Sequence, residues 1–221
     1  MVGAHSGDRG VAALVDVETT GLQPDRDEMV EVAIVLFSFA RDSGTVHAVL
    51  DQYVGLREPS VPISSGAAAM HGLTPEALAG RVFDDARVHA LLRRAELIIA
   101  HNAAFDRGFL TRAYPVAESK PWLCTMRDID WRRRGAGLRS LAALLALHGI
   151  AVERLHCASA DCLATLQLLA RPPRDGAQCS YLKEMLCRHG LQPASGDGVP
   201  GRPGGRVAVR QRGPGGLGLS P

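Results

Sequence analysis

The chain has 221 residues, of which 46% are hydrophobic and 22% are charged, and its formal net charge at pH 7 is +2. This composition is typical of a soluble globular protein and excludes a collagen, a coiled coil and a disulfide scaffold. The near-neutral charge gives no sign of a nucleic-acid partner. No apolar run approaches the ~20 residues that cross a bilayer, and the first residues lack the apolar core of a signal peptide, so we expect a cytoplasmic protein with no membrane contact.

The charge is unevenly distributed along the chain. Residues 190–221 contain 10 Gly, 5 Pro and four Arg against one Asp, so this segment carries +3 and leaves −1 for the rest. It has too few large apolar residues to offset the entropy lost on ordering. We therefore expect a short N-terminal arm at 1–10, one domain at 11–189 and a Gly/Pro/Arg-rich disordered tail at 190–221.

The five cysteines include no CxxC pair. His156, Cys157 and Cys162 are the residues that come nearest to a zinc-ligand set, but their spacing matches no zinc motif. Reduced and mostly buried thiols are the better interpretation.

Three strands are expected first. Residues 11–17 (VAALVDV) form a short aliphatic run typical of a strand buried on both faces, and a turn signal follows at Thr19-Thr20-Gly21. Residues 29–39 and 46–54 read as longer strands separated by a short polar turn. Consecutive strands joined by short turns indicate an antiparallel meander.

Helical signals dominate afterwards. Thr74 and Asp84 are N-cap candidates, and the second should start a helix that runs to about Ala95, with Phe83 and Val88 as a hydrophobic staple. Asn102 should cap a helix that carries Phe105, Phe109 and Ala113 at spacings of four. The remaining expected elements are strands at 97–100 and 122–125 and helices at 138–148, 159–170 and 181–189. This order predicts the α/β class, with a mixed sheet and helices on its faces.

Two acids stand at the end of the first strand. Asp16 and Glu18 are two residues apart, which places both side chains on one face of the sheet. An unpaired carboxylate among Val, Leu and Ala would cost several kcal/mol or become protonated. A bound Mg²⁺ or Mn²⁺ removes that cost, because these ions prefer carboxylate oxygens. The alternative is that the two acids end the strand and face water.

The residues around this pair resemble a known motif. Asp16–Leu22 (DVETTGL) resembles the first exonuclease motif of the DEDD superfamily, in the DnaQ-like branch that includes the proofreading subunit of bacterial DNA polymerase III and RNase T. Glu96–Asp106 (ELIIAHNAAFD) resembles the second motif, in which a strand delivers an aspartate to the first turn of a helix. Asp106 is that aspartate, and the helix dipole alone is another reason for an acid there.

The third motif separates the branches of the superfamily. His156–Asp161 (HCASAD) fits the branch with histidine, known as DEDDh. The spacing is weak on its own, since a surface histidine and an acid at a helix start would give it too, but it follows the other two motifs in order. The resemblance covers about residues 11–170 and implies an RNase H-like fold with a mixed five-stranded sheet.

The resemblance implies a two-metal phosphodiester hydrolase. Asp16 would bridge two Mg²⁺ or Mn²⁺ ions, Glu18 and Asp161 would complete the site of the attacking water, and Asp106 would support the second ion. His156 would be the general base, since an ordinary histidine pKa of ~6.5 leaves it able to accept a proton near pH 7. The family reaction removes nucleoside 5′-monophosphates from a free 3′ end.

A pocket for the terminal nucleotide is also implied. The positions that resemble its lining are Thr19, Leu22, His71, His101, Asn102 and Phe105. An aromatic and a leucine stack against any base, because every base has a π face. For Leu22 and Phe105, plain core packing stays an open alternative.

Three functions remain open from the sequence. The leading one is a 3′–5′ exonuclease of single-stranded or frayed DNA, in replication proofreading or repair. The second is an RNA-trimming exonuclease like RNase T, and the third is an accessory subunit that binds a DNA polymerase. Arg132, Arg133, Arg134 and Arg139, next to Trp131, are candidate contacts for the strand, with a solvated loop as the alternative.

Overall fold

A five-stranded mixed sheet forms the centre of the molecule. The computed structural model describes residues 9–152, 157–172 and 179–192. The strands are β1 (Arg9–Thr19), β2 (Met29–Ala40), β3 (Val46–Leu56), β4 (Leu97–Ala100) and β5 (Trp122–Cys124). Their spatial order is β3-β2-β1-β4-β5. The first three strands are antiparallel, whereas β4 and β5 run parallel to β1, so the expected meander and mixed sheet are confirmed.

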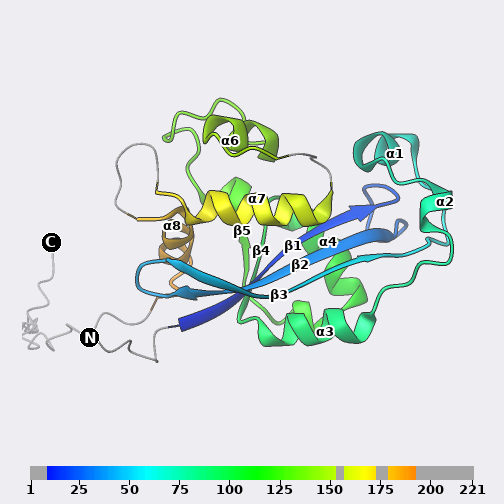
Figure 1. The fold of residues 1–221 in the computed structure, drawn as a ribbon, viewed down its shortest axis with the longest axis horizontal. Coiled ribbons are helices and arrows are strands. Elements are labelled where there is room, and N and C mark those ends of the chain that lie inside the picture. Colours follow the sequence, from blue (N-terminus) through cyan, green and yellow to red (C-terminus); the bar gives the residue numbers. More distant parts are fainter. Residues whose placement is uncertain (1–8, 153–156, 173–178, 193–221) are drawn as a thin grey trace, which may run out of the picture.

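Helices cover both faces of this sheet (Figure 1). They are α1 (Ser65–His71), α2 (Pro75–Leu78), α3 (Asp85–Arg94), α4 (Ala103–Ala113), α5 (Thr125–Asp128), α6 (Leu141–Leu147), α7 (Ala158–Ala170) and α8 (Tyr181–Arg188), with a 3-10 turn at Pro115–Ala117. The alternation of side chains along β1 divides the core between the two faces. Ala12 and Leu14 pack with α7 and α8, whereas Ala13 and Val15 pack with α3 and α4.

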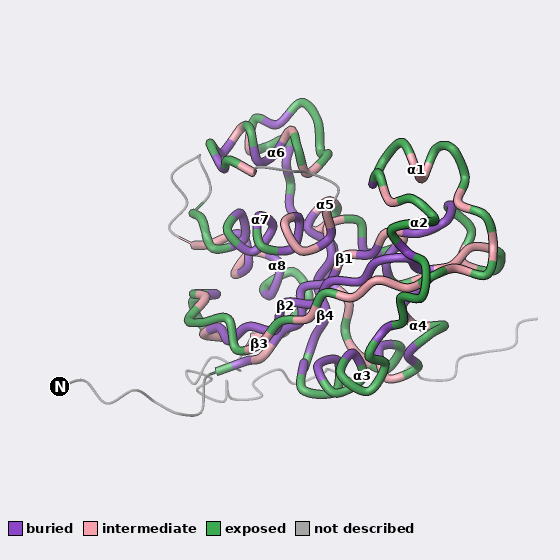
Figure 2. The backbone as a smooth tube through the Cα atoms, turned by 45° about the vertical axis from the view of Figure 1, so that its right-hand side comes forward, coloured by how far each residue is buried: buried purple, intermediate pink, exposed green. Residues whose placement is uncertain are grey.

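This double coverage explains the composition of the central strands. Every residue of β2 from Met29 to Phe39 is buried, and the tube in Figure 2 is buried along the middle of the sheet. A strand covered on both faces needs an apolar run rather than alternation, as the sequence of β2 provides. No helix in the described ranges is both long and apolar enough to cross a membrane.

The expected elements match closely, with three differences. β1 begins at Arg9, two residues before the expected start of the domain. The helix expected at 138 begins at Leu141, because the hydroxyl of Ser140 accepts a hydrogen bond from the amide of Ala143 and caps the helix there. Helices α1 and α5 were not expected, since neither short segment has an apolar stripe. The tail at 193–221 lies outside the described residues.

Candidate active site

Carboxylates from two adjacent strands lie at the carboxyl end of β1. Asp16 and Glu18 point to the face that carries Leu14, which is the face covered by α7. Glu31 of β2 is the cross-strand partner of Glu18 in the sheet register, so its side chain lies on the same face. The sequence therefore places three acids together where the apolar part of the sheet ends.

Asp106 reaches this group from α4. It lies in the first turn of the helix, is 3% exposed, and its Oδ1 accepts a hydrogen bond from the amide of Val17 at 3.2 Å. Asn102 is the N-cap residue as expected, but its side chain makes no capping hydrogen bond. The contact joins the Asp106 carboxylate to the backbone of the residue between Asp16 and Glu18.

Asp161 reaches the group from α7, where it lies in the first turn and is 7% exposed. The next residue, Cys162, is fully buried, and its thiol lies 3.7 Å from the carbonyl oxygen of Leu14. Such a small side chain lets α7 pack directly on β1. The close packing brings Asp161 down to the sheet.

Burial and mutual repulsion raise the pKa values of these acids. Desolvation raises the pKa of Asp16 well above its usual range, and the charges of Asp106, Glu18, Asp161 and Glu31 raise it further. Burial, followed by the charge of Glu31, raises the pKa of Glu18 to about 7. Burial likewise raises the pKa of Asp106 to about 7, although its backbone hydrogen bonds act in the opposite direction. No cationic side chain in the described ranges forms an ion pair with any of these three.

The donor set has the chemistry of a divalent-cation site. Five carboxylates from β1, β2, α4 and α7 are close enough to shift one another's pKa, and oxygen ligands of this kind suit Mg²⁺ and Mn²⁺. Among the described residues, no three His, Cys, Asp or Glu side chains already converge on one point at ligand distances.

Two further observations concern the expected residues. His156, the expected base, lies outside the described residues, immediately before Cys157, the N-cap residue of α7. Glu31 was not singled out from the sequence, although an acid inside the apolar run MVEVAIVLF is the same signal that drew attention to Asp16. One oxygen of Glu31 accepts a hydrogen bond from the amide of Ala158 at 3.4 Å, which joins β2 to the start of α7.

A cavity of about 600 Å³ opens beside Glu18. Four of the six residues expected to bind the terminal nucleotide line it: Thr19, Leu22, His71 and Phe105. Met70 and Ala67 of α1 also line it and were not expected. Leu22 is 81% exposed, so it is not a core residue, whereas Phe105 is half-buried and packs on Phe109 with ring centroids 5.1 Å apart.

Gly21 lets the wall of this cavity form. A Cβ atom at Gly21 would lie 2.5 Å from both carboxylate oxygens of Asp27, so only glycine fits there. Asp27 in turn accepts hydrogen bonds from the hydroxyl of Thr20 at 3.1 Å and from the amide of Gln23 at 2.8 Å. This tight turn leaves Leu22 projecting into solvent.

His71 connects α1 to the end of β1. Its Nδ1 accepts a hydrogen bond from the amide of Leu73 at 2.9 Å, so Nε2 carries the proton and donates it to the carbonyl of Thr19 at 3.2 Å. Burial lowers the pKa of His71, which favours this neutral form. His71 therefore holds the cavity wall in place.

His101 and Asn102 do not line the cavity. His101 Nδ1 lies 2.7 Å from the hydroxyl of Thr125, and its Nε2 donates to the carbonyl oxygen of Arg139 at 2.9 Å. Burial lowers the pKa of His101, so the ring is neutral in this arrangement. His101 thus connects the end of β4 to the segment after β5.

The strand order and the helices on both faces, with acids at the end of the central strand, define the RNase H-like class of fold. Residues 14–169 match the exonuclease family model named RNase T, and the chain belongs to this family of DnaQ-like 3′–5′ exonucleases. Among curated proteins it is 28% identical over 193 residues to the PolC-type DNA polymerase III of Streptococcus suis and 28% identical over 172 residues to that of Thermotoga maritima. These matches cover 80% and 72% of this chain but 11% of each polymerase.

Solved structures of exonucleases have the same fold. A structure of E. coli exonuclease I in complex with a dA16 oligonucleotide matches with a TM-score of 0.62 and 19% identity, over 81% of this chain and 43% of that one. Exonuclease X in complex with 5′ overhanging duplex DNA matches with a TM-score of 0.53 and 25% identity, over 78% of this chain and 99% of that one.

Proposed function

We propose that this protein is a metal-dependent 3′–5′ exonuclease that removes nucleoside 5′-monophosphates from single-stranded or frayed DNA. The observation that carries the proposal is the cavity beside Glu18. It adjoins the buried carboxylates, and its lining combines the exposed Leu22 with the half-buried Phe105. A strand end placed there would set its last base against apolar side chains and its last phosphodiester near the acids.

Asp16, Glu18, Asp106 and Asp161 are proposed to hold two Mg²⁺ or Mn²⁺ ions. Bound ions would supply positive charge that stabilises the attacking and leaving oxygens of the phosphodiester. The raised pKa values of Asp16, Glu18 and Asp106 agree with such a role, because no cationic side chain in the described ranges forms an ion pair with any of these three. His156, just before α7, is proposed to accept the proton of the attacking water.

DNA is the substrate that the comparisons favour. The matching structure of exonuclease I holds a DNA oligonucleotide, and that of exonuclease X holds duplex DNA with a 5′ overhang. The similarity to PolC-type polymerases supports a place in DNA replication or repair, with a DNA polymerase as a candidate partner. RNA trimming is the alternative that the substrate assay below decides.

The test uses DNA and RNA oligonucleotides of one sequence, labelled at the 5′ end, with Mg²⁺, Mn²⁺ or EDTA. We expect a ladder that shortens by one nucleotide at a time from the 3′ end, with mononucleotide as the product and a higher rate on DNA. Asp16→Asn should abolish the ladder, whereas Asp25→Asn, a matched change at an exposed acid, should leave it unchanged. Cleavage that persists in EDTA would contradict the proposal, and a higher rate on RNA would favour the alternative.

His156→Ala tests the proposed base. We expect the rate to fall by roughly 10²–10⁴. Far-ultraviolet circular dichroism should be unchanged. A rate equal to that of the unsubstituted protein would remove His156 from the mechanism.

A further inference from the structure

A second cavity, of about 480 Å³, lies beyond the end of β5 and is lined by arginines. Its rim carries Arg127, Arg132, Arg139 and Arg188, and all four are exposed. Its floor includes the buried indole of Trp131, whose ring nitrogen donates to the carbonyl of Thr125 at 2.7 Å. We call this cavity the arginine pocket. Four guanidinium groups around one cavity suit a phosphate or another anion.

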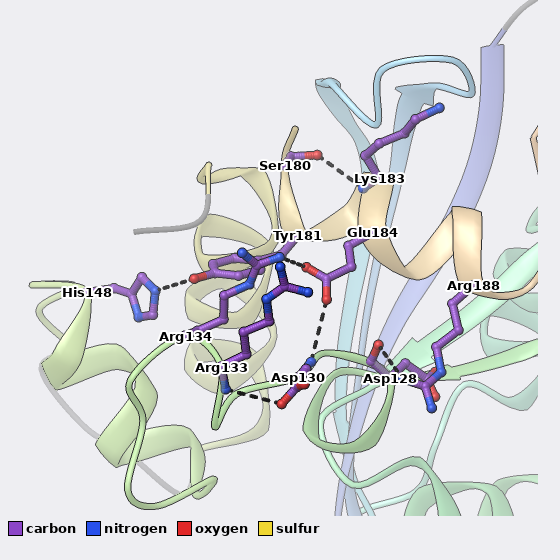
Figure 3. Close-up of polar contacts among 10 residues, drawn as sticks. All are labelled: Asp128, Asp130, Arg133, Arg134, His148, Ser180, Tyr181, Lys183, Glu184 and Arg188. Atoms are coloured by element: carbon purple, nitrogen blue, oxygen red, sulfur yellow. Dashed lines mark hydrogen bonds and ion pairs between the residues drawn. The ribbon is translucent and has the colours of Figure 1, made fainter. Parts of the chain in front are cut away.

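The acids near the pocket bind other groups (Figure 3). Asp128 accepts hydrogen bonds from the amide of Cys124 at 2.7 Å and from His189 at 2.9 Å, and Glu184 forms an ion pair with Arg134 at 2.6 Å. Asp130, the acid that lines the pocket itself, accepts a hydrogen bond from the amide of Arg133 at 3.2 Å.

The four rim arginines keep their charge available. Within the described residues, none of them forms an ion pair with a carboxylate, and Arg188 only donates to the carbonyl of Asp128 at 3.4 Å. An arginine that has no acid partner is free to contact a phosphate. The pocket therefore carries net positive charge, in contrast to the acidic end of β1.

The pocket lies on the same edge of the sheet as the candidate active site. β1, β4 and β5 are parallel, so their carboxyl ends meet at one edge, and neighbouring strands are about 5 Å apart. His101, at the end of β4, bonds to Arg139 of the pocket rim, and its own carbonyl accepts from the amide of Met126 at 3.0 Å. A strand leaving the acids thus needs to cross only β4, roughly 10 Å, to reach the pocket.

We propose that the arginine pocket binds the phosphate backbone of the substrate strand, a few nucleotides on the 5′ side of the bond that is cut. The proposal rests on the proposed function for the direction of the strand. The acids at the end of β1 repel a nucleic acid, so a separate cationic contact is needed to hold the strand between cuts. Trp131 beneath the arginines provides the shape of the pocket rather than a stacking surface, because its ring is buried.

The binding experiment compares two double variants with equal change in charge. Arg132→Gln/Arg139→Gln alters the pocket. Arg9→Gln/Arg93→Gln alters two exposed arginines away from it, one at the start of β1 and one in the last turn of α3, the helix that leads into β4. Both are made in the Asp16→Asn background and titrated, in EDTA, into fluorescent single-stranded DNA of twelve nucleotides at several salt concentrations. The pocket variant should bind roughly tenfold more weakly, with a salt slope reduced by about 1.4, or 0.7 for each lost phosphate contact.

The activity experiment uses the same two pairs of changes with Asp16 intact. With Mg²⁺, the pocket variant should lose about tenfold in kcat/KM on the twelve-nucleotide strand but keep the full rate on a dinucleotide, which is too short to reach the pocket. The control variant should match the unsubstituted protein on both. This dependence on substrate length separates a contact with the distant backbone from a disturbed active site.

The outcomes distinguish the two proposals. Equal binding by both double variants would overturn the arginine pocket as a strand site. An equal loss of rate on both substrates would also overturn it. If the unsubstituted protein cut neither substrate, the proposed function would fail, while the binding comparison would still decide whether the pocket holds DNA.

Discussion

The carboxylates of Asp51 and Asp16 have opposite electrostatic surroundings. Asp51 on β3 lies between two arginines of α3, with Arg94 at 2.7 Å and Arg87 on its other oxygen. Desolvation acts to raise its pKa, but the hydrogen bond from Arg94 and the charge of Arg87 outweigh it, and the pKa of Asp51 lies below its ordinary value. Burial raises the pKa of Asp16, and among the described residues the charges that raise it further are those of Asp106, Glu18, Asp161 and Glu31.

The difference separates an acid that serves the fold from an acid that serves chemistry. A paired carboxylate stabilises the folded state, and evolution can keep it for that reason alone. Buried acids that repel one another destabilise the folded state, so their presence needs another explanation, such as a bound cation. The sign of an acid's effect on stability is therefore a test of its role.

The largest expected effect comes from Asp16→Asn. We expect exonuclease activity to fall by about 10³-fold or more, equal to about 4 kcal/mol or more in the activation barrier. In EDTA near pH 8, the melting temperature should rise by several degrees, because a buried and repelled charge is removed. Nuclease assays and thermal melts measure the two effects.

Asp51→Asn is the matched change in the paired group. It should leave activity unchanged and lower the melting temperature slightly, because two arginines lose their partner. Opposite signs in the two variants would show that Asp51 stabilises the fold and that Asp16 destabilises it. A lower melting temperature for Asp16→Asn would contradict this difference.

Glu31→Gln addresses the acid of β2 that lies opposite Glu18. We expect the affinity for Mn²⁺, measured by calorimetry, to fall by about 10–100-fold, as for other residues that orient metal ligands. The amide of glutamine can still accept the hydrogen bond from Ala158, so α7 should stay in place. An unchanged Mn²⁺ affinity would show that Glu31 has no part in the ion site.

The acids also predict how stability depends on pH in EDTA. The pKa of Glu18 and that of Asp106 are each raised to about 7 from ordinary values of 4.5 and 3.8. A raised pKa means that the folded protein holds these protons more tightly than the unfolded chain does. Protonation therefore adds to the free energy of unfolding. This contribution is complete below about pH 4 and is lost as the pH rises through about 7. The melting temperature should fall by several degrees between about pH 5 and about pH 8.

Saturating Mg²⁺ should reverse this trend, because an ion bound to the charged carboxylates stabilises the folded state most where they are ionised. The Asp16→Asn variant should show a shallower fall in EDTA. A melting temperature that stays constant with pH would contradict the raised pKa values.

The smallest expected effect comes from Arg94→Gln at the surface ion pair. The melting temperature should fall by a few degrees at most, and this difference should disappear in about 1 M salt, where charges are screened beyond roughly 3 Å. Activity on DNA should be unchanged. A change in activity would mean that the ion pairs of Asp51 also influence the candidate active site.

The sequence predicted the strands well, and it drew attention to four of the five acids that the structure brings together. The apolar runs of β1 and β2 are typical of strands that are covered on both faces of a sheet, so they predict strands there. An acid within such a run is conspicuous, because burying an unpaired carboxylate is costly. The same reasoning, applied to Glu31, would have added the fifth acid. Caps at Thr74 and Asp84 are confirmed, because each side chain accepts a hydrogen bond from an amide three residues later.

The parts that sequence reasoning did not predict depend on contacts between distant segments. His101 belongs to the second motif, but its orientation is set by Thr125 and Arg139, which no local pattern reveals. Helix α1 is rich in alanine and has no apolar stripe, so neither the helix nor the place of Met70 in the cavity wall was expected. The cavity becomes visible only when α1 packs beside β1.

The way in which α1 is attached to the end of β1 allows the sequence around α1 to vary between related proteins. The segment between β3 and α3 contains α1 and α2. Two hydrogen bonds join it to the end of β1, one from His71 to the carbonyl of Thr19 at 3.2 Å and one from the amide of Ser64 to the carbonyl of Thr20 at 2.8 Å. Its length and sequence can therefore change while the register of the sheet stays the same. The wall of the cavity can therefore change without any change in the acids at the end of β1, so related proteins can differ in this wall while they keep the same acids.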